Sequence, residues 1–576
     1  MCGIVGYQGE DEASDIIFKG LKKLEYRGYD SAGIATAGNP SIKIDKGTGT
    51  VDEAVSTGLD GNSGVGHTRW ATHGGINQTN AHPHTDCEDT VAVVHNGIID
   101  NHRELREELE EHEFDSETDT EVIPHLLEEA VEEHGSVKDA AMEVIDKLEG
   151  SFAVVATFDT GEMVAFRRNS PLVLGVGDGE TFVASDVTPF LEHTENAVFL
   201  EDGDMAVIDE EGHEVYRDGE KVEREVERVD WDAQQASKAG FDHFMEKEIK
   251  EQPTTVKRAV FQDRSELEKA RDMIEDAENV YFTACGTAGI AASLGAKYFR
   301  DAGYRPEVEL SHELEYRTGE IGENDLVIAV SQSGETADLL SVLRQTDAEV
   351  LAVVNVVGST LARNADHRLF VNAGPEIGVA STKAFTGQVA VLKMLKYALE
   401  DRIDEGRESL LETAEKAGEV IEDNEDTIEE LSSYFSDKDD IYFIGRNRGH
   451  DLAREAALKL KELSYIHAEA FPGGEFKHGT LALVEEGVPV VSFLKEEGYE
   501  DILTNTVEAK GRGADIIGVG TEEPPEGFEH FIEIPEDENS EILEIIPFQL
   551  LAYLTSVEVG NNPDKPRNLA KSITVK

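Results

Sequence analysis

Cysteine is scarce in this sequence, which has three among 576 residues: Cys2, Cys87 and Cys285. Three thiols so far apart do not make a disulfide framework, and they lack the spacing of a metal-binding motif. We therefore expect no metal centre, no cluster of His and Cys ligands and no cofactor. Cys87 is expected to be structural or incidental.

Long apolar runs are also missing. By sequence, no stretch suffices to cross a bilayer, and no basic segment followed by an apolar one precedes Cys2. These absences predict a cytoplasmic protein without a membrane partner.

Positive charge is in short supply as well, with 52 Lys and Arg against 120 Asp and Glu, a net charge of −68. Because binding to a phosphate backbone needs a basic surface, nucleic acid is excluded as a partner. The acidic residues are spread over helical stretches such as 104–113 and 405–430. Molar salt shortens the Debye length to about 3 Å, which makes such self-repulsion tolerable. The distribution indicates a halophile that keeps salt in its cytoplasm.

The length of the chain predicts about three or four domains. Short β runs alternate with turns over the first 220 residues or so, with helical stretches at 10–24 and 120–134, which indicates an α+β domain. The domains expected are 2–220, then a charged linker 221–245, then 246–405, 406–560 and a C-terminal tail 561–576.

The second half repeats a strand, a loop and a helix, which predicts doubly wound α/β domains with parallel sheets. The segment 441–447 echoes 280–286, so we infer two copies related by duplication and joined by the acidic helical stretch 401–435. In the second copy the polar loop has become Lys495-Glu496-Glu497-Gly498. That loop is unsuited to an anion, so we expect phosphate in the first copy alone.

Cys2 follows the initiator methionine and is the most informative residue of the chain. Removal of Met1 would leave one residue with a thiol nucleophile and an α-amine, whose pKa near ~8 suits it to act as the base. A chance cysteine is the plainer explanation, and the motifs that follow decide between the two.

Three further motifs match the needs of a nucleophile that attacks an amino-acid side chain. Arg69 is suited to bidentate binding of a carboxylate. The Asn96 amide and the Gly97 backbone N–H could hold the oxyanion of a tetrahedral intermediate. Asp119 could pair with a substrate ammonium. Each motif alone has a structural explanation, but together with Cys2 they would recognise an amino acid at both ends.

These motifs, together with 1–6 and 24–33, resemble the N-terminal-nucleophile (class II) glutamine amidotransferases. The resemblance implies an Ntn hydrolase αββα sandwich, glutamine as the substrate and ammonia as the product. It also implies that Cys2 is the nucleophile and that Asn96 and Gly97 form the oxyanion hole. The implied glutamine contacts are Arg27, Arg69, Thr72, His73 and Asp119, with Trp70 as a gate for ammonia.

In the second half, the turn 331–336 is rich in hydroxyl groups and opens a helix, which suits a phosphate, although plain helix capping explains it equally well. Glu455, Lys459 and Glu462 share one helical face. That pattern usually means surface salt bridges, but in a cleft a Glu beside a Lys could move protons at a sugar carbonyl. His478 lies on a glycine-rich loop, and Lys571 lies in the tail, where desolvation would let it form a Schiff base.

These features resemble the sugar isomerase (SIS) domain family. The resemblance implies that Lys571 opens a ketose as an imine, that Glu462 moves a proton between C1 and C2, and that His478 of a partner subunit assists ring opening. Ala288 and Thr480 depart from the usual Ser and Pro and put only pocket detail in doubt. The implied sugar-phosphate contacts are Thr287, Ser331, Gln332, Ser333, Thr336, Val379, Ser381, Glu455 and Lys459.

Taken together, the two resemblances imply a homodimeric enzyme that acts on L-glutamine and D-fructose 6-phosphate. Internally channelled ammonia would convert the sugar to D-glucosamine 6-phosphate. Two alternatives stay open. One is a glutamine phosphoribosylpyrophosphate amidotransferase, against which the duplicated α/β half argues. The other is a non-catalytic phosphosugar sensor, which would need neither Cys2 nor Lys571 nor Glu462.

Overall fold

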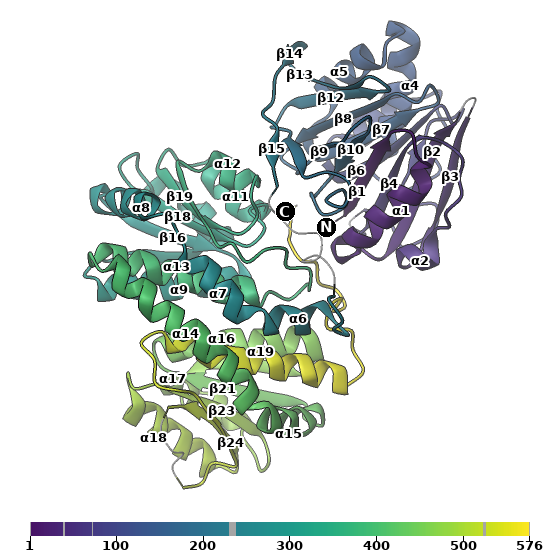
Figure 1. The fold of residues 1–576 in the computed structure, drawn as a ribbon. Coiled ribbons are helices and arrows are strands. Elements are labelled where there is room, and N and C mark those ends of the chain that lie inside the picture. The colour runs from purple at the N-terminus through teal and green to yellow at the C-terminus, as the bar shows by residue number, and fades with distance from the viewer. Residues whose placement is uncertain (1, 39–40, 72, 230–237, 522–525, 575–576) are drawn as a thin grey trace. The chain divides into compact units, whose positions relative to one another are not determined.

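A computed structural model describes residues 2–38, 41–71, 73–229, 238–521 and 526–574, and its elements are shown in Figure 1. The chain divides into two compact units. The first unit consists of 1–236 and 570–576, and the second of 237–569.

The first unit contains two antiparallel sheets. The eight-stranded sheet has the order β15 (Glu227–Arg228), β11 (Asn196–Phe199), β9 (Val173–Val176), β10 (Thr181–Ala184), β1 (Gly3–Gln8), β4 (Ser63–Arg69), β2 (Ser31–Gly38), β3 (Ser41–Thr48). The seven-stranded sheet has the order β14 (Glu220–Val222), β13 (Gly212–Arg217), β12 (Asp204–Asp209), β8 (Met163–Arg168), β7 (Gly150–Phe158), β6 (Val91–Ile99), β5 (His84–Thr85).

Alternating side chains bury both faces of these sheets and produce the expected αββα layering. On β1, Ile4 packs into the core between the sheets, whereas Val5 faces α1 (Ala13–Leu24). On β6, Val94 faces the same inner core and Val93 packs against α4 (Val122–His134) and α5 (Val137–Lys147). Each such fully buried side chain contributes about 1.5–3 kcal/mol. Both sheets are therefore held between layers of helices. The short helices α2 (Val51–Ala54) and α3 (His102–Glu108) lie in the connections after β3 and β6.

The second unit contains two parallel five-stranded sheets. One has the order β17 (Glu307–Leu310), β16 (Val280–Ala284), β18 (Leu326–Ser331), β19 (Glu349–Val354), β20 (His367–Phe370). The other has the order β22 (His467–Pro472), β21 (Asp440–Gly445), β23 (Pro489–Leu494), β24 (Asp515–Gly520), β25 (His530–Glu533). Both orders read 2-1-3-4-5 along the chain, so the two α/β halves share one doubly wound topology.

The helices of this unit cover both sheets and join them. They are α6 (Phe244–Lys250), α7 (Gln252–Val260), α8 (Arg264–Asp276), α9 (Gly286–Asp301), α10 (Ser311–Leu314), α11 (Ala337–Arg344), α12 (Thr360–Asn364), α13 (Lys383–Leu399), α14 (Ile403–Asp423), α15 (Glu425–Ser436), α16 (Arg448–Ser464), α17 (Gly473–Phe476), α18 (Tyr499–Lys510) and α19 (Ser540–Glu558). One continuous core runs through both α/β halves.

Helix α19 corrects the expectation that no segment is long and apolar enough to cross a membrane. By length and composition it could do so, but 83% of its most apolar window is buried inside the protein. It packs against α14, α15 and α16. Its apolar character therefore belongs to a core helix that both α/β halves share.

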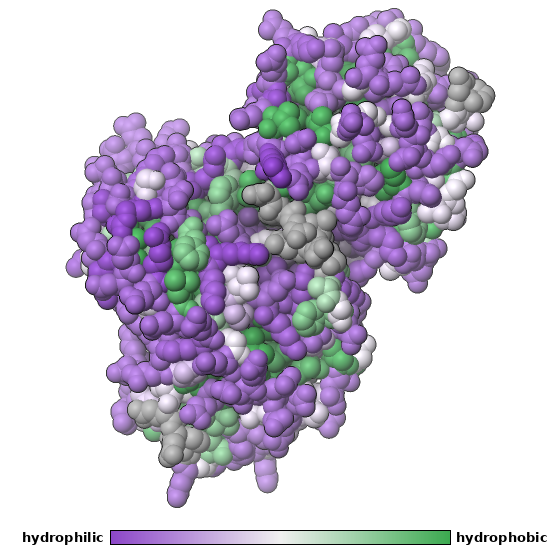
Figure 2. All heavy atoms as spheres, in the orientation of Figure 1, coloured by the Kyte–Doolittle hydropathy of each residue, from purple (hydrophilic) through white to green (hydrophobic). Residues whose placement is uncertain are grey.

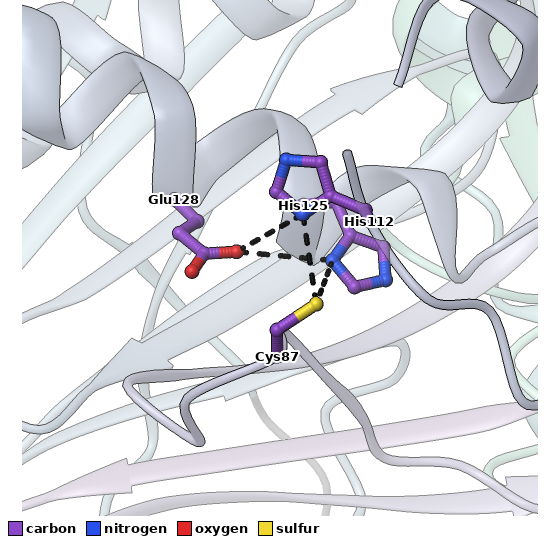
Figure 3. Close-up of side chains that lie close together, drawn as sticks. All are labelled: Cys87, His112, His125 and Glu128. Atoms are coloured by element: carbon purple, nitrogen blue, oxygen red, sulfur yellow. Dashed lines mark hydrogen bonds and ion pairs between the residues drawn. The ribbon is translucent and has the colours of Figure 1, made fainter. Parts of the chain in front are cut away.

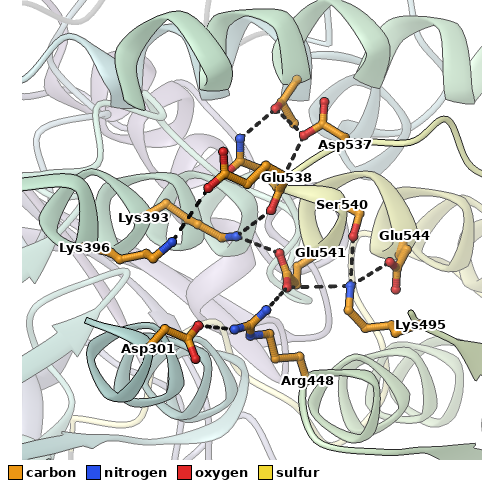
Figure 4. A network of polar contacts seen from close by, with 12 residues as sticks. Asp301, Lys393, Lys396, Arg448, Lys495, Asp537, Glu538, Ser540, Glu541 and Glu544 are labelled. Carbon is orange, nitrogen blue, oxygen red and sulfur yellow. Dashed lines mark hydrogen bonds and ion pairs between the residues drawn. The ribbon is translucent and has the colours of Figure 1, made fainter. Parts of the chain in front are cut away.

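The first turns of α19 carry a buried charge network, shown in Figure 4. Glu541 forms ion pairs with Lys393 at 2.9 Å, Lys495 at 3.6 Å and Arg448 at 3.6 Å. Lys495 also pairs with Glu544 at 2.8 Å. In the second copy, Lys495 of the loop that stands in place of the phosphate loop thus forms ion pairs with two glutamates of α19.

The surface agrees with the composition. Figure 2 shows a face dominated by hydrophilic residues, with hydrophobic atoms in small separate areas. On α14 the residues Glu408, Glu412, Glu415, Glu419 and Glu422 are all exposed. The expected linker 221–245 is not wholly irregular, because Glu227 and Arg228 form β15 and pair with β11.

Candidate active sites

Cys2 lies immediately before β1, in the first unit. Its Sγ accepts a hydrogen bond from the Trp70 backbone N–H at 3.3 Å and lies 3.5 Å from the Trp70 carbonyl oxygen. Burial raises the pKa of the Cys2 thiol, and the positive charge of Arg69 opposes that shift. A buried thiol of raised pKa needs a neighbouring base before it can attack a carbonyl.

Asn96 lies on β6, and its Nδ2 donates to the Cys2 carbonyl oxygen at 3.0 Å. Its Oδ1 lies 3.1 Å from His67 Nε2, which is also 3.0 Å from the His95 carbonyl oxygen. Both neighbours of Nε2 are acceptors, so Nε2 carries the proton, and the Asn96 amide is held with its donor toward Cys2. Sequence reasoning missed His67, although it stands two residues before Arg69 on the same strand.

Gly97 follows with φ of +133°, and a Cβ there would lie 1.9 Å from the Ser151 carbonyl oxygen. Because L side chains rarely adopt this φ and no space exists for one, the position requires glycine. One of the two expected oxyanion donors, Gly97, is therefore at a position whose backbone accepts only glycine.

Arg69 ends β4, and its guanidinium donates to the carbonyl oxygens of His73 and Gly75, the latter at 3.3 Å. Burial lowers the pKa of Arg69, and the charges of Cys2 and Asp119 oppose that shift. Asp119 accepts from the Ile99 N–H at 2.8 Å. Cys2, Arg69 and Asp119 thus lie close enough for their charges to interact. Thr72, another expected glutamine contact, lies outside the described residues.

Two further predicted residues have firm partners. Arg27 is buried and pairs with Asp186 at 2.8 Å, in a contact that also includes the Tyr26 hydroxyl. The Trp70 ring meets Tyr29 edge to face at 5.6 Å. These contacts fix both side chains, while the roles expected for them at glutamine remain predictions.

The buried histidines His67, His82, His84 and His95 form a group that includes the partner of Asn96, which is His67. His82 Nε2 and His95 Nδ1 lie 2.8 and 2.9 Å from the Thr120 hydroxyl, and His84 Nε2 lies 3.1 Å from the Thr118 hydroxyl. Burial lowers the pKa of each ring and brings that of His67 to about 3. The histidines are therefore neutral at physiological pH.

In the second unit, the loop 331–336 begins at the last residue of β18, next to β16, where the strand order reverses. This point of a doubly wound sheet is where ligands bind. Ser331 Oγ accepts from the Gly334 N–H at 2.9 Å, and Ser333 Oγ from the Glu335 N–H at 3.2 Å. Gln332 and Thr336 flank these residues and are partly exposed. The loop thus forms a tight turn lined with polar groups at the start of α11.

Glu455, Lys459 and Glu462 form a cluster on α16. Lys459 Nζ lies 2.6 Å from Glu462 and 3.6 Å from Glu455, and Thr287 donates to Glu455 at 3.2 Å. Burial raises the pKa of Glu455 to about 7, against the lowering effect of Lys459. Burial alone would lower the pKa of Lys459, but Glu462 and Glu455 outweigh it and raise that pKa. Glu455 and Lys459 are therefore buried and do not form a surface salt bridge. Their cluster extends to Thr287 at the start of α9.

The segment with Val379 and Ser381 packs near the beginning of the tail. Ser381 Oγ donates to Glu376 at 2.9 Å, and the Val379 N–H donates to the Asp564 carbonyl oxygen at 3.2 Å. Asn561 Nδ2 donates to the Leu463 carbonyl oxygen at 2.9 Å, next to Glu462. The tail is thus anchored on the α16 end that carries the proton-transfer candidate.

His478 and Lys571 are placed differently. His478 is exposed on the turn after α17. Lys571 is partly exposed and belongs to the first unit, whereas the α16 cluster belongs to the second. The roles expected for these two residues remain predictions.

The expectation that the chain holds no cluster of His and Cys ligands is wrong. Cys87, His112, His125 and Glu128 place their ligand atoms within 4.8 Å of one another, so a cluster with Cys and His ligands exists in the first unit. Sequence spacing did not reveal it, because its members come from two loops and one helix.

Known proteins place this architecture in context. The SIS domain family matches residues 273–398 and 434–558, and the glutamine amidotransferase domain family matches 67–192. Isomerizing glutamine–fructose-6-phosphate aminotransferases from Thermococcus kodakarensis and Halobacterium salinarum are 44% and 43% identical, each over the whole of both chains.

Among solved structures, the C-terminal domain of glucosamine-fructose-6-phosphate aminotransferase from Francisella tularensis matches with a TM-score of 0.53 and 34% identity. The match covers 57% of this chain and all of that one. With the full-length relatives at more than 40% identity, these findings show that the chain belongs to the family of isomerizing glutamine–fructose-6-phosphate aminotransferases.

Proposed function

We propose that the protein transfers the amide nitrogen of L-glutamine to D-fructose 6-phosphate and isomerises the product to D-glucosamine 6-phosphate. The observation that carries this proposal is the similarity, along the entire chain, to isomerizing glutamine–fructose-6-phosphate aminotransferases. The Cys2–Asn96 contact and the buried Glu455–Lys459 pair support it, because a phosphosugar sensor needs neither.

In the first half-reaction the Cys2 thiolate attacks the side-chain carbonyl carbon of glutamine. The α-amine of Cys2, once Met1 is removed, takes the thiol proton and passes it to the leaving ammonia. The Asn96 amide and the Gly97 N–H stabilise the oxyanion. Water then hydrolyses the thioester to glutamate. Arg69 and Asp119 bind the two ends of the amino acid, and Arg27, Thr72 and His73 complete its surroundings.

In the second half-reaction the Lys571 amine condenses with the C2 ketone of the sugar and releases water. Ammonia displaces the lysine, and Glu462 takes a proton from C1 and returns one to C2. The phosphate is held by the loop 331–336 together with Thr287 and Ser381. Ammonia reaches this site inside the protein, with Trp70 as its gate, because bulk water would protonate it and remove its nucleophilicity.

The assembly expected is a cytoplasmic homodimer whose domains follow the boundaries 2–220, 246–405 and 406–560. His478 is exposed, so in such a dimer it would be accessible to the partner's sugar site.

Product formation from glutamine and fructose 6-phosphate in molar KCl tests the proposal, with a Cys2→Ala variant beside the wild type. The wild type should make glucosamine 6-phosphate, and the variant should do so only when ammonia is added. Consumption of glutamine without amination of the sugar would reject the assignment. Glu462→Gln should keep glutamine hydrolysis and lose about 10²–10⁴-fold in sugar product.

A further inference from the structure

Four potential metal ligands converge in the first unit, and none of them is a residue assigned to catalysis. Figure 3 shows Cys87, His112, His125 and Glu128 pointing toward one another. Cys87 lies in the loop between β5 and β6, and His112 lies in the segment between α3 and α4. His125 and Glu128 are three residues apart on α4, and the His125 side chain is 1% exposed.

Four of the six distances between the ligand atoms are close to the edges of a tetrahedron, and all six are within 4.8 Å. Cys87 Sγ lies 3.7 Å from His112 Nδ1 and 3.8 Å from His125 Nδ1. Glu128 Oε2 lies 3.3 Å from His112 Nδ1 and 3.8 Å from His125 Nδ1. Around a zinc ion with Zn–S of about 2.3 Å and Zn–N of about 2.0 Å, neighbouring ligand atoms are about 3.3–3.6 Å apart. A small contraction of the cluster would satisfy that geometry.

The surroundings of the cluster also suit a metal. Glu129 Oε1 lies 3.1 Å from His112 Nε2, the outer nitrogen of that ring. A carboxylate in this position orients a ligating imidazole and raises its basicity. Glu128 Oε2 is buried and faces the centre of the cluster, where its near neighbours are the two Nδ1 atoms. A cation at the centre would compensate this oxygen and engage both Nδ1 atoms at once.

We propose that Cys87, His112, His125 and Glu128 bind one Zn²⁺ ion as a structural site. A thiolate, two imidazoles and a carboxylate in tetrahedral arrangement favour zinc over calcium or magnesium. The thiol proton is released on binding. The divalent charge is balanced by one thiolate and one carboxylate. Four protein ligands leave no open position for water, so the ion has no direct part in catalysis.

The site has a clear mechanical consequence. The ligands His112 and His125 lie on either side of Asp119, whose carboxylate accepts from Ile99 on β6. Zinc would therefore fix both ends of the segment that carries the expected contact for the substrate ammonium. Cys87 adds a link to the loop that leads into β6, the strand that carries Asn96. The ion acts as a positioning element for the glutamine site.

Cobalt substitution tests the proposal on the full-length chain. Cys2→Ala is used as the background, so that the catalytic thiol cannot be a ligand. The protein is treated with chelator in molar KCl, and one equivalent of Co²⁺ is added. We expect a thiolate-to-cobalt charge-transfer band and the strong visible absorption of tetrahedral cobalt. Both should disappear in Cys87→Ser, and zinc content should fall from about one ion per chain to near zero.

Cys285→Ser is the matched control, because Cys285 also lies near a histidine and an aspartate, His312 and Asp338. This variant should bind metal as the background does. Equal metal content in Cys87→Ser and Cys285→Ser, or a weak octahedral cobalt spectrum without sulfur absorption, would overturn the proposal. Cys87 is exposed on a loop, so its substitution leaves the core intact.

A kinetic readout tests the positioning role on protein that retains Cys2. Chelation should raise the KM for glutamine at least several-fold with a smaller change in kcat, and zinc should restore it. Cys87→Ser should show the raised KM with or without chelator. An unchanged KM after complete loss of zinc would refute the link to Asp119.

Discussion

The imidazole of His67 decides which way the Asn96 amide faces. His67 lies on β4 of one sheet and reaches β6 of the other, where its Nε2 meets Asn96 Oδ1 at 3.1 Å. The residue types needed for the chemistry, Cys2 and Asn96 among them, could be picked out from the sequence by what each group can do. The orienting contact could not, because it depends on how two sheets pack face to face.

The Asn96 donor should matter for glutamine hydrolysis and for nothing else. Asn96→Ala removes one oxyanion donor, so we expect a loss of about 10²–10³-fold in kcat of glutamine hydrolysis. Ammonia-dependent synthesis should be unchanged. Asn101→Ala is the control, since Asn101 is partly exposed and bonds to the backbone of Lys147 and Glu149. A hydrolysis rate within threefold of wild type in Asn96→Ala would contradict the assignment.

The buried histidines make acid destabilising. Burial lowers the pKa of His67, His82, His84 and His95 in the folded protein. Below about pH 6.5 the unfolded chain binds more protons than the folded one, so stability falls as pH falls. Each histidine contributes a slope of up to about 1.4 kcal/mol per pH unit between pH 6.5 and its folded pKa.

Urea unfolding of the wild type and of His84→Gln at pH 7, 6 and 5 measures this effect. The variant should lose less stability between pH 7 and pH 5 than the wild type, by up to about 1.4 kcal/mol per pH unit. Parallel pH profiles for His84→Gln and wild type would show that this ring is not neutral in the folded state.

Among the elements, α19 departs most from what its sequence suggests. An apolar 19-residue helix late in the chain is compatible with a membrane span or with a core. Only packing against α14, α15 and α16 distinguishes the two. The strand–loop–helix repeats were predictable, because alternation of strand and helix and the recurrence of 280–286 at 441–447 are local features. The Cys87–Glu128 cluster was not, since its ligands lie on separate elements.

The first turn of α19 should be sensitive to loss of one carboxylate. Lys393, Lys495 and Arg448 outweigh the effect of burial and lower the pKa of Glu541. Glu541→Gln leaves these cations without their shared partner, so we expect a loss of about 3–5 kcal/mol in the free energy of unfolding.

Glu544→Gln is the matched comparison, because burial raises the pKa of Glu544 and Lys495 keeps Glu541 as a partner. This variant should cost less than half as much in chemical unfolding at neutral pH. Equal losses for the two variants would mean that the shared position of Glu541 has no special weight.

At the scale of the whole molecule, the composition constrains stability more than it constrains function. The active-site chemistry uses few charges, yet the net charge is −68. Exposed glutamates on α14 follow one another along the solvent side of a helix whose other side, with Leu410, Ala414 and Ala417, is buried. The acidic residues of α14 were therefore predictable as surface residues, and the net charge predicts how that surface responds to salt.

Low salt should unfold the protein. At 0.01 M ionic strength the Debye length is about 30 Å, so the surface carboxylates repel one another across the whole molecule, whereas at 1 M it is about 3 Å. Circular dichroism along a KCl series should show loss of structure as KCl falls from 2 M to 0.05 M. NaCl at equal ionic strength should protect equally well, and sucrose at equal osmolality should protect less, because it does not screen charge. A native spectrum in 0.05 M KCl would show that attractive contacts in the core exceed the repulsion without help from salt, and the acidic surface would then serve solubility alone.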